Sequence, residues 1–186
     1  MSPLPPMPPT VTRTRLHMRQ IQLQGWKRSD GLWDIEARLT DTKDRDYVIA
    51  SGVRPRGEPV HDLRVCVTID RDFNILDAAA SSDAVPYPGG CDTIAPAYRK
   101  IVGLNLVRGF RRSVAAMFET VRGCSHLTEL LASLPTAAIQ TFASEARDTE
   151  GFDPNVKPFQ LDRCHALDTG SETVRRYYPR WYRGQP

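Results

Sequence analysis

The sequence DLRVCVTID, residues 62 to 70, decides the fold because its polar and apolar residues alternate along its whole length. A period of two places successive side chains on opposite faces of a β-strand. One face carries aliphatic side chains and the other carries mostly polar ones, which predicts a strand with one buried face. The aliphatic residues are Leu63, Val65, Val67 and Ile69.

The same period continues on both sides of this strand. Upstream, residues 15–26 and 32–39 alternate around the turn signal Ser29-Asp30-Gly31, which predicts a β-hairpin. Residues 47–50 are expected to add a short strand, and residues 73–81 a further one. The first half of the chain is therefore expected to form a mostly antiparallel sheet.

After residue 91 the period changes from two to about 3.6, which is the period of an α-helix. We expect helices over residues 92–102 and 110–121, and a third that starts at Cys124 and is kinked or divided at Pro135. Residues 164–178 are typical of a last hairpin. The predicted fold class is α+β: a mostly antiparallel sheet packed against about three helices, with extra β elements at both ends.

Composition limits the class of protein. Of the 186 residues 40% are apolar and 25% charged, which is typical of a soluble globular chain, and the net charge of +3 does not demand nucleic acid or an anionic membrane as partner. The proline-rich residues 1–14 are expected to form an extended arm without the apolar core of a signal peptide, and residues 15–186 a single α+β domain. We expect a cytoplasmic protein that binds neither membrane nor nucleic acid, and the sequence indicates no oligomeric state.

Two cysteines, Cys91 and Cys124, each follow a glycine where a helix is expected to begin. The positive end of a helix stabilises a thiolate, which binds metals or attacks electrophiles, and a glycine lets the backbone turn tightly. His61 and Asp62 open the strand upstream. Since thiolate, imidazole and carboxylate suit zinc or iron, we predict a single such ion bound by His61, Asp62, Cys91 and Cys124. The alternative is that both cysteines are inert core residues.

Two further residues are predicted to act in catalysis. Asp83 precedes the Cys91 loop and would serve as general base for a metal-bound water, and His126 lies two positions after Cys124. A turn-forming aspartate and a hydrogen-bonded structural histidine are the alternative interpretations. The tail at residues 175–183 interleaves arginines with aromatic rings. It would stack on bases, wall a pocket for a small molecule, or simply pack with its arginines in solvent.

Residues 59–142 resemble the NifU/SufE-like fold of iron–sulfur cluster scaffold proteins. The resemblance is carried by Pro59 to Leu63, by Gly90-Cys91 and by Cys124 to Leu127. It implies a scaffold-like core with a metal site. His61 stands where a scaffold has cysteine, and a cluster requires mostly thiolates, so the resemblance favours a single ion over a cluster.

The whole chain is also similar to an uncharacterised bacterial family, a domain of unknown function. The matching stretches are DGLWDIE at residues 30–36, GCSHLTEL at 123–130 and RYYPRWY at 176–182. That family implies no activity. Three functions therefore stand as hypotheses. The first is a metal-dependent lyase or hydrolase acting on a small molecule, for which the tail hints at an aromatic one. The others are a metal, sulfur or iron–sulfur carrier, and a binding or interaction module without metal.

Overall fold

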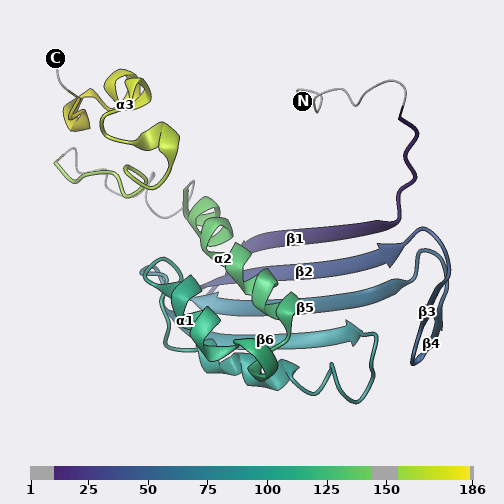
Figure 1. Cartoon of the computed structure of the whole chain (residues 1–186). Coiled ribbons are helices and arrows are strands. Elements are labelled where there is room, and N and C mark those ends of the chain that lie inside the picture. The colour runs from purple at the N-terminus through teal and green to yellow at the C-terminus, as the bar shows by residue number, and fades with distance from the viewer. Residues whose placement is uncertain (1–10, 144–154, 185–186) are drawn as a thin grey trace. The chain divides into compact units, whose positions relative to one another are not determined.

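The computed structural model describes residues 11–143 and 155–184. The chain divides into two compact units, residues 1–142 and 143–186. The first unit holds a four-stranded sheet with helices lying across one of its faces (Figure 1). Most of the predicted arm, residues 1–10, lies outside the described residues. The single domain over residues 15–186 stays a prediction.

The sheet confirms the predicted α+β class. Its strands lie in the order β1, β2, β5, β6, and each is antiparallel to its neighbours. A separate hairpin of β3 and β4 is inserted between β2 and β5. The strands are β1 (His17–Lys27), β2 (Trp33–Lys43), β3 (Tyr47–Ile49), β4 (Gly52–Arg54), β5 (Pro59–Ile69) and β6 (Ile75–Ala84).

The helices follow the strands, as the change of period predicts. The first unit contains the 3₁₀ helix η1 (Ala95–Ile101), α1 (Phe110–Met117), the 3₁₀ turn η2 (Thr120–Arg122) and α2 (Ser125–Ala143). The second contains η3 (His165–Leu167), α3 (Glu172–Tyr177) and η4 (Pro179–Trp181). Within residues 11–143 and 155–184, no helix has both the length and the hydrophobicity that crossing a bilayer requires.

The core lies between the sheet and α2. The register sets Leu39 opposite Leu63 and Ile35 opposite Val67, so the aliphatic faces of β2 and β5 form one surface. The apolar face of α2 covers this surface, and removal of these side chains from water drives the packing. The α2 residues with 0% exposure are Leu127, Leu130, Leu131, Leu134, Ala138 and Phe142.

Two predicted helices differ from those observed. The helix expected over residues 92–102 is a 3₁₀ helix that begins at Ala95, because the Thr93 hydroxyl donates to the Gly90 carbonyl at 2.8 Å instead of capping it. The second helix ends at Met117, and Val121 is 95% exposed rather than buried in an apolar stripe. Within α2 the chain stays helical through Pro135 to Ala143.

The hairpin predicted over residues 164–178 is wrong, because this segment forms short helices. The Ser171 hydroxyl accepts a hydrogen bond from the Val174 N–H at 3.2 Å and so caps α3. Arg175 and Glu172, three residues apart, pair at 2.7 Å. Serine and aspartate are favoured both in turns and at helix starts, so a capped helix and a hairpin turn share the same local sequence signal.

Replacement of Phe142 by alanine tests the placement of the α2 end against the sheet. The Phe142 ring is 0% exposed and lies 4.6 Å, centroid to centroid, from both Trp33 and Phe73. We expect Phe142→Ala to lower the free energy of unfolding by about 3–5 kcal/mol, measured by urea denaturation. Tyr87→Ala, at a 53% exposed ring, is the control and should change it by less than about 0.5 kcal/mol. A loss below about 1 kcal/mol in Phe142→Ala would contradict the described packing.

Candidate functional site

One row of residues across the helix-covered face of the sheet is polar. The register places Arg19 of β1 opposite Asp41 of β2, and Asp41 opposite His61 of β5. Side chains two positions apart on a strand share a face, so these three lie one row beyond Leu39 and Leu63. The aliphatic surface of the sheet therefore ends in a carboxylate flanked by a guanidinium and an imidazole.

Asp41 is the centre of this row, and its side chain is 4% exposed. The Nε and Nη2 atoms of Arg19 each donate to one of its oxygens at 2.8 Å. His17 Nε2 lies 2.8 Å from Oδ1, and His61 Nδ1 lies 3.0 Å from Oδ2. Burial alone would raise the pKa of Asp41, but the hydrogen bonds from Arg19 and His17 hold that pKa well below its usual range. Asp41 is therefore a buried carboxylate anion at neutral pH.

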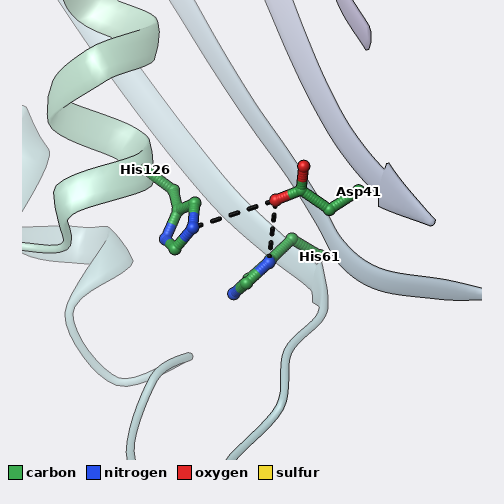
Figure 2. A group of neighbouring side chains, drawn as sticks. All are labelled: Asp41, His61 and His126. Atoms are coloured by element: carbon green, nitrogen blue, oxygen red, sulfur yellow. Dashed lines mark hydrogen bonds and ion pairs between the residues drawn. The ribbon is translucent and has the colours of Figure 1, made fainter. Parts of the chain in front are cut away.

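The first turn of α2 brings a third histidine to this carboxylate. His126 Nε2 lies 3.8 Å from Asp41 Oδ2, and the His126 ring lies against that of His61, with centroids 3.9 Å apart and the ring planes tilted by 31°. Figure 2 shows both imidazoles turned toward the same carboxylate oxygen. Arg19 also reaches α2, since its Nη1 lies 2.5 Å from Glu129 Oε2. The start of α2 is thus tied to the polar row at two points.

His61 and His126 belong to a group that could hold a metal ion. Asp41 Oδ2 and one ring nitrogen from each histidine lie within 4.8 Å of one another. Burial lowers the pKa of His61, and the neighbouring His126 lowers it further. Asp41 raises this pKa, but the overall shift is downward. The net effect favours the neutral imidazole, which is the form that binds metals.

A cleft of about 700 Å³ lies beside the two histidines. It is lined by His61 and Leu63 of β5, by residues of the 85–94 loop, and by residues of the 121–126 segment that leads into α2. The volume falls within the range of small-molecule sites. Cys91 and Cys124 both line it, so four of the predicted site residues, including His61 and His126, face one cleft.

Cys124 stands at the helix start, as predicted. Its carbonyl accepts the first hydrogen bond of α2, from the Thr128 N–H at 2.9 Å. The Tyr98 hydroxyl holds its backbone, donating to the carbonyl and accepting from the N–H, each at 2.8 Å. Burial would raise the pKa of Cys124, but His126, with Nδ1 4.0 Å from Sγ, and the N–H groups of Leu127 and His126 lower that pKa overall.

Two predicted site residues do not reach the cleft. Asp62 follows His61 on β5 and so points to the opposite face, where Arg38 holds its two oxygens at 2.8 and 2.6 Å. Asp83 pairs with Arg64 at 2.9 Å instead of facing the histidines. Asp62 is therefore removed from the predicted ligand set, because adjacent residues of one strand point to opposite faces and cannot both bind one ion.

The glycines before the two cysteines have different roles from the predicted tight turn. Cys91 lies in a turn four residues before η1, and the left-handed residue of that turn is Gly89, with φ +79°. Gly123 is extended, with φ −150°. A Cβ on Gly123 would lie 2.6 Å from the Phe118 Cβ and 2.8 Å from its carbonyl oxygen. Gly123 is therefore needed for close packing just before Cys124.

Cys66 and the arginines of the C-terminal tail are not among the described residues that line the cleft. Cys66 is on the uncovered face of the sheet, and burial raises its pKa to about 11. In the tail, the Arg176 guanidinium lies over the Tyr177 ring at 5.2 Å and that of Arg180 over Trp181 at 5.7 Å. These arginines stack on their own neighbours, and a ligand for the tail stays a prediction.

Asp41, Arg19 and His17 are the site residues that the sequence analysis missed. Their signal was present in the alternation, because Asp41 follows Leu39 by two positions on the same face, and Arg19 precedes Ile21 by two. His61 stands in the same relation to Leu63. The apolar face of each strand thus ends in a polar residue. That these three residues lie side by side follows only from the register of the strands.

Comparison with known proteins identifies a family for most of this region. A family model described as "Protein of unknown function (DUF2889)" matches residues 17–140, which include the polar row, both histidines and the residues that line the cleft. No curated protein and no solved structure matches the chain. The predicted domain-of-unknown-function family is confirmed, and the NifU/SufE-like resemblance stays a prediction.

Alkylation rates should separate the two half-buried thiols Cys66 and Cys124. The thiolate is the reactive form. Because the pKa of Cys66 is about 11, only about 0.01% of this thiol is ionised at pH 7. The pKa of Cys124 is lowered. We expect iodoacetamide at pH 7 to modify Cys124 at least tenfold faster than Cys66, measured by peptide mass spectrometry. In urea-unfolded protein the two rates should converge, and equal rates in the folded protein would contradict the described environments.

Gly123→Ala tests the close packing before Cys124. The added Cβ would meet the Phe118 backbone, so we expect a loss of about 1–3 kcal/mol in the free energy of unfolding. Gly90→Ala is the matched control, because its Cβ would make an ordinary contact at 3.5 Å with the Tyr87 carbonyl. Urea denaturation of both variants measures the difference, and equal stabilities would refute the role given to Gly123.

Proposed function

We propose that this chain, which belongs to the DUF2889 family, is a metal-dependent enzyme that acts on a small molecule. The observation that carries the proposal is the group of Asp41, His61 and His126, whose ligand atoms lie within 4.8 Å of one another beside a cleft. Two imidazoles and one carboxylate are the donor set of catalytic zinc sites and of non-haem iron(II) sites. Zinc or iron is therefore the proposed ion.

The distances in the group suit such an ion. Metal–ligand bonds of about 2.0–2.1 Å in a tetrahedral site place neighbouring ligand atoms about 3.3–3.4 Å apart. His61 Nδ1 lies 3.0 Å and His126 Nε2 3.8 Å from Asp41 Oδ2, on either side of that value. An ion would take the place of the hydrogen bond between His61 and Asp41.

Arg19 and His17 would support the site by orienting Asp41. Carboxylate ligands in metal sites are commonly held by hydrogen bonds from neighbouring side chains, and Arg19 donates to both oxygens of Asp41. The guanidinium also balances the charge of the carboxylate. A divalent ion held with two neutral imidazoles would therefore keep most of its positive charge and act as a strong Lewis acid.

Three protein ligands leave a coordination position for water or a substrate oxygen. A bound ion lowers the pKa of its water or polarises a carbonyl, which supports a hydrolase or a lyase. Asp83 is turned away by Arg64, so Asp83 would not serve as the base beside this ion. The cytoplasm stays the proposed compartment, which the four free thiols favour.

A second candidate function is the metal or sulfur carrier implied by the scaffold resemblance. The observation that favours it is that His61, Cys91 and Cys124 line one cleft. In that case the two thiolates would bind the cargo together with His61. The two candidates use different ligand sets, which makes them separable by substitution.

Metal content distinguishes the two ligand sets. We expect anaerobically purified, tag-free protein to hold close to one zinc or iron ion per chain by elemental analysis. His61→Ala and His126→Ala should lose it, while Cys91→Ala and the control His165→Ala, at an exposed histidine of the second unit, should keep it. Circular dichroism verifies that each variant is folded.

Each other outcome has a defined meaning. Loss of the metal in Cys91→Ala and Cys124→Ala, with retention in His126→Ala, would favour the carrier. Wild-type protein that contains no metal and takes up neither zinc nor iron would refute both metal functions and leave the binding module.

A further inference from the structure

We infer that the substrate of the proposed metal centre is an uncharged molecule with an apolar body and a single oxygen group. This inference rests on the proposed function and deepens it, because it assigns the chemical class that the cleft beside His61 and His126 would bind. It is carried by the side chains that line the cleft, by the exposed residues among them, and by the position of the polar groups.

The described lining of the cleft contains no acidic or strongly basic side chain. Among the described residues, the fourteen that line it include no lysine, arginine, aspartate or glutamate. A quarter of the chain is charged, so fourteen residues chosen at random would include three or four such side chains. A charged substrate group in this cleft would find no ion-pair partner except the metal, and an unpaired charge is costly to remove from water.

Apolar side chains form most of the remaining lining. Val85, Tyr87 and Ile94 come from the 85–94 loop, and Val121 comes from the segment before α2. Val121 is 95% exposed and Tyr87 is 53% exposed, so both present apolar surface to solvent at the cleft. These exposed apolar side chains supply surface that an apolar ligand in the cleft would cover.

Polar side chains lie at the metal end of the cleft. His61 and His126 lie there, and Ser125 Oγ is 3.4 Å from His126 Nδ1. Beyond these, Thr93 and Tyr87 carry the other hydroxyl groups among the lining residues that the structure describes, and the Thr93 hydroxyl donates to the Gly90 carbonyl at 2.8 Å. A sugar or a peptide would leave most of its hydrogen-bonding groups unpaired in such a cleft. A ligand with one oxygen directed at the metal and a hydrocarbon body against Val85, Ile94 and Val121 would fit both the polar end and the apolar lining of the cleft.

Binding of two matched probes to the metal-free protein tests the inference. 2-Naphthol and 2-naphthoate share a flat body of the same size, and 2-naphthoate carries a negative charge at pH 7. We expect isothermal titration calorimetry with chelator-treated protein to show binding of 2-naphthol at least tenfold tighter than that of 2-naphthoate. Equal or tighter binding of 2-naphthoate overturns the inference.

A pair of variants locates the probe. Val121→Asp places a charge on the cleft lining at an exposed position, and Val48→Asp does the same on β3, at a 76% exposed valine that does not line the cleft. We expect Val121→Asp to weaken 2-naphthol binding at least fivefold and Val48→Asp to change it less than twofold. Equal effects of the two variants overturn the location.

The same samples separate this inference from the proposed function. Zinc uptake without 2-naphthol binding overturns the substrate class and leaves the metal centre supported. Binding of 2-naphthol by a protein that takes up neither zinc nor iron supports the ligand class of the cleft and overturns the metal-dependent reaction.

Discussion

The buried carboxylate of Asp41 is the interaction on which the rest of the unit depends. It joins β1 through Arg19, β5 through His61 and the first turn of α2 through His126. A buried charge is tolerated only when its partners are in place, so the strand register and the position of α2 are constrained together. The same constraint that orders these elements also brings two imidazoles to one oxygen atom.

Much of the sheet could be predicted from the sequence because its information is local. The alternation in residues 62–70 identifies β5 and its buried face without any knowledge of its neighbours. The helical spacing of the leucines in α2 likewise identifies that helix and its buried face from local sequence alone. The C-terminal helices were missed because Ser171 caps α3 with a residue type that turns also use, and neighbouring residues do not distinguish the two.

The candidate site was harder to predict because its residues are brought together by register. Cys124 and His126 were found from their place at a helix start, and His61 from its place at the start of a strand. Asp41 lies on β2, and its meeting with His61 depends on the pairing of two strands that the β3–β4 hairpin separates in sequence. Asp62 was included because it is adjacent in sequence, although adjacent strand residues point to opposite faces.

The β3–β4 hairpin supports one wall of the cleft, and it can vary independently of the group of Asp41, His61 and His126. Arg54 Nη2 donates to the Val85 carbonyl at 2.8 Å, and the Ser51 hydroxyl donates to the Pro86 carbonyl at 2.5 Å, so this insertion supports the 85–94 loop. The polar row depends on β1, β2 and β5, which pair without the hairpin. Changes in the length or sequence of the hairpin would therefore reshape the ligand side of the cleft while Arg19, Asp41 and His61 keep their places. Proteins of one family could in this way keep the same polar row and still differ in the shape of the cleft beside it.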